Sequence, residues 1–197
     1  MQKSIAFFDF DGTITSKDTM LELAKFKTGG LSYLIGMFIL SPWLISMKLG
    51  IISKQTAKEK LLSYFFGDSD LQSFNNLCKD FSNKVIPDLI KKEAKDAIDN
   101  HLLNNTPVII VSASAENWVA PWCISNNLQF ICTRLKVTEH KITGKLEGEN
   151  CNEKEKVCRI NKIFNLTDFT TIYCYGDSKA DQPMLQIATH SFYRTFV

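Results

Sequence analysis

The sequence of 197 residues predicts an α/β fold built on a doubly wound, parallel sheet. Three apolar runs carry this prediction. The run at 4–8 ends in Asp9 and Asp11, and the run at 107–111 is continuous and rich in β-branched residues, as in a strand buried on both faces. The run at 170–175 leads into Gly176 and Asp177. Helical periodicity lies between these runs, so strands alternate with helices.

The remaining elements follow from local signals. Asp18 and Thr19 are typical of a helix start, Gly29 and Gly30 of a helix end, and Pro121 lies early in a further helix. In chain order, we expect helices at 20–27, 53–66, 71–84 and 88–103, a helix after 112–114, a strand at 128–133, a hairpin at 136–147, a helix at 152–164 and a strand at 191–197.

Composition sets limits on size, partners and compartment. With 45% hydrophobic and 22% charged residues, the chain has material for one well-buried core and a smaller insert. The net charge of +2 gives nucleic-acid binding no support. The six cysteines form no Cys-x-x-Cys pair, which is typical of a reducing compartment, and no signal peptide is expected because Asp9 and Asp11 interrupt the first apolar run. The default location is the cytoplasm.

The stretch 31–47 contains seventeen residues without a charge and allows three interpretations. It is shorter than the roughly 20 residues of a spanning helix, and Pro42 interrupts it, which disfavours a transmembrane segment. It also suits a helix lying on a membrane surface, flanked by Lys25, Lys27, Lys48 and Lys54, which would make the protein peripheral to a membrane. A buried helix or helical hairpin in a small soluble insert is the favoured interpretation.

The spacing of Asp9 and Asp11 suggests chemistry at the end of the first strand. Side chains alternate along a strand, so these two carboxylates leave the same edge of the chain and can meet one ligand. In a parallel sheet that ligand lies beyond the carboxyl ends of the strands. The competing interpretation is a strand that ends in an ordinary Asx turn, since Asp and Gly are common turn residues.

Polar residues follow two other predicted strands, namely Ser112 and the segment 176–181, which contains Asp177 and Asp181. Right-handed crossovers bring such strand ends to a common edge of the sheet. Lys156 lies near the start of the helix before the 170–175 strand. The chain therefore predicts a polar site shared by segments far apart in the sequence.

With these motifs, the chain resembles the haloacid dehalogenase-like hydrolases, and within them the group that includes the phosphoserine phosphatases. The matching motifs are 9–13, Ser112, Lys156 and 176–181, in the order seen in that family. The resemblance covers essentially the whole chain. It implies a Rossmann-like core at 1–15 and 85–197, and an inserted helical cap at 16–84.

The resemblance also implies a Mg²⁺-dependent phosphatase that acts through an aspartyl-phosphate. Asp9 would be the nucleophile and Asp11 the general acid and base. Mg²⁺ would be held by the Asp9 carboxylate, the Asp11 backbone carbonyl and Asp177. Four further groups would support the reaction. Ser112 and the Ala113 amide would bind phosphoryl oxygens, Lys156 would neutralise their charge, and Asp181 would orient the site or bind the metal.

Several of these assignments have alternatives. Ser112 also suits a helix cap, and Asp181 a helix surface. Lys154 competes with Lys156, which fits the Glu-x-Lys-Val pattern of the group better. Asp18 either caps its helix or faces the opening of the cap. Lys58 and Lys60 are expected on a solvated face, although one of them can reach toward the first motif from above.

The substrate is expected to be a small-molecule phosphate monoester or the headgroup of a lipid phosphate. The first arginine is Arg134, so the cap has no arginine to clamp a substrate carboxylate, which counts against phosphoserine. The apolar stretch 31–47 favours a lipid phosphate as the second choice, because some relatives with such caps are phosphatidylglycerophosphate phosphatases. A non-catalytic phospho-acceptor switch is a different class, but it needs neither Asp11 nor a cap. Nothing in the sequence indicates an oligomeric state.

Overall fold

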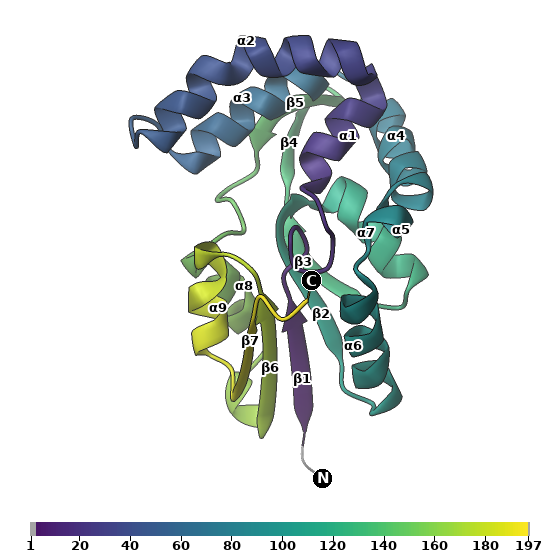
Figure 1. Cartoon of the computed structure of the whole chain (residues 1–197), viewed down its shortest axis with the longest axis vertical. Helices are drawn as coiled ribbons and strands as arrows, with labels where there is room; N and C mark the ends of the chain where they lie inside the picture. Colours follow the sequence, from purple (N-terminus) through teal and green to yellow (C-terminus); the bar gives the residue numbers. More distant parts are fainter. Residues whose placement is uncertain (1–2, 197) are drawn as a thin grey trace.

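The computed structural model describes residues 3–196. Its centre is a parallel sheet of five strands in the order β3-β2-β1-β6-β7 (Figure 1). The strands are β1 (Ser4–Phe8), β2 (Val108–Ala115), β3 (Gln129–Thr133), β6 (Thr171–Gly176) and β7 (His190–Tyr193). The chain builds the sheet outward from β1 on one side and then from β6 on the other, so the order reverses between these two strands. This confirms the predicted doubly wound α/β fold.

Helices cover both faces of the sheet (Figure 1). Alternate residues of β1 explain how: Ala6 and Phe8 belong to one buried cluster, and Ile5 and Phe7 to the other. The first cluster packs on α6 (Lys92–Leu103) and α7 (Glu116–Ser125), and the second on α8 (Lys154–Ile163) and α9 (Gln182–Gln186). Short turns of 3-10 helix occur at η1 (Leu166–Asp168) and η2 (Lys179–Asp181).

Four helices between β1 and β2 form a helical lobe beyond the carboxyl ends of the strands (Figure 1). They are α1 (Thr19–Thr28), α2 (Gly30–Lys48), α3 (Lys54–Phe66) and α4 (Leu71–Lys84). Asp18, Ser53 and Asp70 begin α1, α3 and α4, because each side chain accepts a hydrogen bond from a backbone amide three residues later.

The predicted hairpin is present as β4 (Leu135–Thr138) and β5 (Lys141–Leu146), and it packs on the helical lobe. Gly144 makes this contact, since a Cβ atom on it would clash with the backbone of Ser63 in α3. The hairpin therefore joins the lobe to the sheet.

Two predicted elements have different boundaries in the structure. The expected helix at 88–103 is divided into α5 (Ile86–Leu89) and α6, because Ile90 leaves the helix to form a bridge with Thr15. The last strand, expected at 191–197, is β7 at His190–Tyr193, and residue 197 lies outside the described part of the chain.

The favoured interpretation of 31–47 as a buried segment is wrong. These residues lie in α2, one continuous helix of which only Gly36 and Leu40 are buried. Within residues 3–196, α2 is the one helix long and apolar enough, by length and composition, to cross a membrane. Its inner side packs on the helical lobe, while its outer side faces away from the protein (Figure 1).

Candidate active site

The candidate site begins at Asp9, where β1 ends. The Asp9 amide donates to the carbonyl of Tyr175 in β6 (3.0 Å), which holds Asp9 where the strand order reverses. Its side chain is buried, and Thr13 Oγ1 donates to Asp9 Oδ2 (3.0 Å). The first motif thus fixes its own aspartate through the turn that follows the strand.

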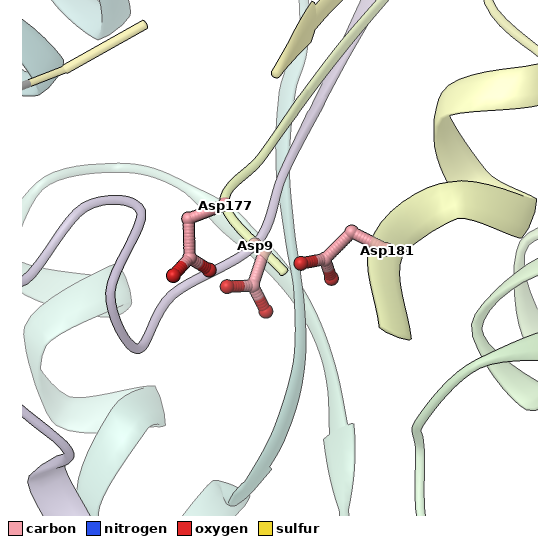
Figure 2. Close-up of side chains that lie close together, drawn as sticks. All are labelled: Asp9, Asp177 and Asp181. Carbon is pink, nitrogen blue, oxygen red and sulfur yellow. The ribbon is translucent and has the colours of Figure 1, made fainter. Parts of the chain in front are cut away.

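Two aspartates from the other end of the chain lie beside Asp9. Asp177 follows β6 and Asp181 ends η2. Carboxylate oxygens of Asp9, Asp177 and Asp181 all lie within 4.8 Å of one another, with Asp9 between the other two (Figure 2). Thr13 Oγ1 is also 3.3 Å from Asp177 Oδ1, so one hydroxyl contacts both motifs. We call these three aspartates the carboxylate cluster.

A buried lysine joins the carboxylate cluster. Lys156 lies in the first turns of α8, and its Nζ is 2.5 Å from Asp9 Oδ1 and 2.7 Å from Asp181 Oδ1. Lys154, the competing residue, is exposed. Of the two lysines, the structure therefore brings Lys156 into the site.

Two glycines let the backbone approach these carboxylates. Gly12 has a φ of +83°, and a Cβ atom on it would lie 2.5 Å from Asp177 Oδ2. A Cβ atom on Gly176 would lie 2.5 Å from the Cβ of Asp181. Lys91 supports the first of these turns by donating to the Gly12 carbonyl (2.7 Å). Sequence reasoning missed Lys91, because no motif surrounds it.

Asp11 lies at the edge of the site and faces the helical lobe. Its Oδ1 accepts from the Thr19 amide (2.7 Å) and the Thr19 hydroxyl (2.6 Å), and its Oδ2 accepts from Ser114 Oγ (2.5 Å). Trp118 Nε1 in turn donates to Thr19 Oγ1 (3.0 Å). Sequence reasoning missed Thr19 and Ser114 as partners of Asp11. The sequence does mark both positions, since Ser114 lies two residues after the predicted site residue Ser112 and Thr19 lies at a predicted helix start.

Ser112 and Ala113 come from the end of β2. Ser112 is fully buried, and its Oγ accepts a hydrogen bond from the Ser114 amide (2.9 Å). It does not begin a helix, because β2 continues to Ala115 and α7 starts at Glu116. Ala113 lines the cavity above the carboxylate cluster.

That cavity has a volume of about 480 Å³ and lies between the sheet and the helical lobe. Its lower wall contains Asp9, Asp11, Ser114, Lys156, Asp177 and Asp181. The upper wall is largely apolar and includes Met20, Leu21, Met37, Leu44, Met47 and Leu61 from the lobe. A small polar group can therefore meet the aspartates while an apolar group contacts the lobe.

Three charged side chains on the side of the helical lobe also line the cavity, namely Asp18, Lys54 and Lys58. Lys58 Nζ lies 3.0 Å from Asn150 Oδ1 and donates to the Ala113 carbonyl, so it reaches the sheet, whereas Lys60 lies over the Trp43 ring. Burial lowers the pKa of Lys58 to about 8, against the attraction of Asp11 and Asp18. Asp18 caps α1 and also faces the cavity. Its side chain is open to solvent on one side, but desolvation by the surrounding lobe and the charge of Asp11 raise its pKa to about 6.

Burial and neighbouring charges shift the pKa values in the carboxylate cluster. Burial raises the pKa of Asp9 to about 7, although Lys156 opposes this effect. Burial and the charge of Asp181 raise the pKa of Asp177. Burial acts in the same sense on Asp181, but Lys156 outweighs it and lowers the Asp181 pKa. Burial opposes the charge on Lys156, yet Asp9 and Asp181 together raise its pKa.

The carboxylate cluster has the composition of a site for a hard divalent cation. Its donors are all oxygen atoms, without the histidine or cysteine that zinc sites prefer. One lysine balances only part of the charge of three carboxylates. The residues therefore fit Mg²⁺, and a cation there would relieve the repulsion that raises the pKa of Asp177.

Comparison with known proteins extends over almost the whole chain. A family model described as haloacid dehalogenase-like hydrolase matches residues 6–186. The chain is 30% identical over 193 residues to Protein CicA of Caulobacter vibrioides, covering 96% of this chain and 85% of that protein. It is 28% identical over 205 residues to a probable phosphatase of Mycobacterium tuberculosis, covering 96% of this chain and 68% of that protein.

Solved structures share the fold. A protein of unknown function from Bordetella pertussis Tohama I superposes with a TM-score of 0.82 at 23% identity, covering 97% of this chain and 89% of that one. A phosphoserine phosphatase, solved as an analogue of its phospho-aspartyl intermediate, superposes with a TM-score of 0.66 at 21% identity, covering 97% and 86%.

Proposed function

The chain belongs to the haloacid dehalogenase-like hydrolases, and we propose that it hydrolyses phosphate monoesters with Mg²⁺ through an aspartyl-phosphate intermediate. One observation carries the proposal. Asp9 ends the central strand within 4.8 Å of Asp177 and Asp181, and Lys156 and Asp11 lie on either side of it in one cavity. The similarity to a probable phosphatase and to a phosphoserine phosphatase supports the same reaction class.

In the first step Asp9 is the nucleophile. A carboxylate oxygen of Asp9 forms a bond to phosphorus, the bond from phosphorus to the ester oxygen breaks, and that oxygen takes a proton from Asp11. In the second step Asp11 removes a proton from water, the water oxygen forms a bond to phosphorus, and the bond from phosphorus to the Asp9 oxygen breaks, which releases inorganic phosphate and restores the Asp9 carboxylate. The hydrogen bonds from Thr19 and Ser114 hold Asp11 at the cavity edge, where both transfers take place.

We assign the metal to the Asp9 carboxylate, the Asp11 backbone carbonyl and Asp177. When bound, Mg²⁺ supplies positive charge that offsets the repulsion between these carboxylates and the phosphate. Lys156 adds a fixed positive charge beside Asp9, and Asp181 holds Lys156 in place. Ser112 and the Ala113 amide bind phosphoryl oxygens in this proposal.

We further propose that residues 16–84 act as a cap over a core formed by 1–15 and 85–197. The apolar upper wall of the cavity, and the reach of Lys58 from α3 to the Ala113 carbonyl, support this division. The cap then excludes water and selects the group that carries the phosphate. The cytoplasm suits the five buried free cysteines, which oxidation would disrupt.

For the substrate, a small-molecule phosphate monoester is the first choice. A lipid phosphate is the second, and it is supported by Met37, Leu44 and Met47, which give the cavity an apolar wall on the side of α2. Phosphoserine is third, because the cap offers Lys58 in place of an arginine clamp. Release of phosphate from a panel containing phosphatidylglycerophosphate, phosphoserine and sugar phosphates decides the order, and a clear preference for phosphoserine would reverse it.

The activity itself is tested with p-nitrophenyl phosphate. We expect steady turnover in Mg²⁺, no turnover in excess EDTA, and a loss of at least about a hundredfold in Asp9→Asn. Asp88→Asn is the matched control, because it removes the charge of an exposed aspartate at the start of α5. A single stoichiometric burst without turnover would instead indicate a phospho-acceptor switch. Turnover that survives Asp9→Asn would refute the nucleophile assignment.

A further inference from the structure

The outer side of α2 presents a continuous apolar surface. Most of its large exposed apolar residues recur every three or four positions, and the exposed Pro42 lies in the one longer gap, so they share one face. We call this face the outer strip, and it consists of Leu31, Leu34, Ile35, Phe38, Ile39, Ile45 and Leu49. Phe38 is 80% exposed and Leu31 is 74% exposed, which is unusual for the face of a helix that should meet water.

The inner side of α2 fixes the helix flat against the lobe. A Cβ atom on Gly36 would lie 2.7 Å from the Tyr64 ring and 2.8 Å from the Phe65 ring, so α2 and α3 pack closely at this point. Leu40 is buried in the main apolar cluster. A helix held along its length in this way does not cross a bilayer, although its length and composition would allow it.

The polar groups in the middle of α2 are satisfied within the helix. Pro42 has no amide hydrogen for the Phe38 carbonyl, and Ser41 Oγ donates to that carbonyl instead (2.7 Å). Ser46 Oγ donates to the Pro42 carbonyl (2.8 Å). These hydroxyls therefore need no partner in the surface that covers the helix, which suits hydrocarbon better than a protein interface with its own hydrogen bonds.

The charged residues in the segment that carries the outer strip are all lysines. No aspartate or glutamate occurs between Glu22 and Glu59, whereas this segment contains Lys25, Lys27, Lys48, Lys54 and Lys58. Lys25, Lys27, Lys48 and Lys54 are exposed near the two ends of α2. Lys27 Nζ donates to the Phe65 carbonyl (2.7 Å) and Lys54 pairs with Glu153 (2.6 Å), which leaves Lys25 and Lys48 without an ion pair among the described residues. Lys60 lies 4.3 Å above the ring of the exposed Trp43, which combines a cation with the aromatic residue typical of membrane interfaces.

We propose that the outer strip and its flanking lysines dock the protein on the surface of an anionic lipid bilayer. In this arrangement α2 lies in the plane of the interface, the strip enters the boundary between headgroups and acyl chains, and Lys25 and Lys48 contact lipid phosphates. The opposite side of α2 lines the cavity through Met37, Leu44 and Met47. Docking therefore brings the cavity to within about one helix diameter, roughly 10–12 Å, of the membrane surface. The inference does not depend on hydrolysis.

Binding is measured by co-sedimentation with vesicles. We expect the protein to sediment with vesicles of phosphatidylglycerol and phosphatidylcholine, and to bind vesicles of phosphatidylcholine alone at least about tenfold more weakly. The double variant Leu31→Ser with Phe38→Ser should lose at least about tenfold in partition, since it removes two large side chains from the strip. Absence of binding to the anionic vesicles would overturn the proposal.

The chain offers a matched control outside the outer strip. Leu103 is 83% exposed and Ile163 is 61% exposed, and they lie on α6 and α8 beside the sheet. Leu103→Ser with Ile163→Ser removes similar exposed apolar side chains and should leave vesicle binding unchanged. Equal losses in the two double variants would mean that the strip has no special role, and would overturn the proposal.

The charge requirement has its own variant. Lys25→Gln with Lys48→Gln should reduce binding to anionic vesicles on the order of 30-fold at low salt, because each lysine near such a surface contributes roughly 1 kcal/mol. If vesicle binding is the same in this variant and is unaffected by added salt, the electrostatic part of the proposal is wrong.

Two further readouts separate docking from other causes. Light scattering after size exclusion gives the oligomeric state without lipid. If the protein is a dimer that does not bind vesicles, and Leu31→Ser with Phe38→Ser makes it a monomer, the strip contacts a second copy of this chain and the proposal is wrong. Asp9→Asn should bind vesicles like the unchanged protein, and the strip variant should hydrolyse p-nitrophenyl phosphate at the unchanged rate. Failure of docking is thereby distinguished from failure of the proposed activity.

Discussion

Gly12 and Asp177 come from opposite ends of the chain, yet a Cβ atom on Gly12 would lie 2.5 Å from the Oδ2 atom of Asp177. The turn after the first strand therefore packs directly against the acidic side chain that follows β6. Thr13, the next residue, contacts Asp9 and Asp177 with one hydroxyl. The position of Asp177 in the carboxylate cluster thus depends on the absence of a side chain at Gly12.

Gly12→Ala should displace Asp177 and reduce turnover on the order of 100-fold, because a shift of about 1 Å at a reacting centre has an effect of this size. The measurement is turnover of p-nitrophenyl phosphate. Gly148→Ala is the control, since Gly148 also has a positive φ (+78°) but nothing within 4 Å of its added Cβ. Similar turnover in the two variants would show that the contact between Gly12 and Asp177 does not control the activity.

Lys156→Met should lower the free energy of unfolding by about 3–5 kcal/mol near neutral pH, since it leaves two buried carboxylates without their counter-charge. Urea denaturation measures this change. Lys154→Met removes the same charge from an exposed position of the same helix and should change stability by less than about 0.5 kcal/mol. Adding Asp9→Asn to Lys156→Met should recover part of the loss. Equal stabilities of the two lysine variants would contradict the buried ion pairs.

Ser114→Ala should lower kcat on the order of tenfold with little change in KM, because it removes the hydroxyl that holds Asp11 Oδ2 at 2.5 Å. Steady-state kinetics give both constants. Ser125→Ala is the control, as the Ser125 hydroxyl bonds to the Trp122 carbonyl at the far end of α7. An unchanged kcat in Ser114→Ala would mean that Thr19 alone orients Asp11.

We expect His101 to contribute to the loss of folding stability at acid pH. Its Nε2 lies 2.9 Å from the Tyr175 hydroxyl, and burial lowers its pKa from the usual 6.5. Near this pKa the native protein therefore binds fewer protons at His101 than the unfolded chain does. The stabilisation that comes from keeping His101 neutral is fully present above the unfolded-state pKa of about 6.5 and is lost as the pH falls below it. His101→Gln retains polar atoms but does not titrate.

The free energy of unfolding, measured by urea denaturation between about pH 7.5 and 5.5, should therefore fall less in His101→Gln than in the unchanged protein. Other titrating groups, including Asp9, are common to both proteins, so the difference reports on His101. Parallel pH dependences would show that His101 has the same pKa in the native and the unfolded protein, which would contradict this prediction.

Much of the fold was predictable because its signals are local. The continuous β-branched run before Ser112 indicates a strand buried on both faces, and the alternation of strands with helices leaves few topologies. Motif order predicted that Asp9 and Asp177 would lie at one sheet edge, since parallel strands place their carboxyl ends together. The structure brings them within 4.8 Å of each other.

The sequence by itself determined the strands, the parallel sheet and the edge at which the aspartates gather, because side-chain period and turn residues act over a few neighbouring positions. Only the tertiary structure decided between Lys154 and Lys156, and it turned Asp11 toward Thr19 and Ser114. It also placed most of α2 on the outside of the protein, although its composition indicated burial. The physical reason is that helix rotation and side-chain partners are set by packing between distant segments, and a uniformly apolar helix such as α2 carries no periodic signal to say which side faces inward.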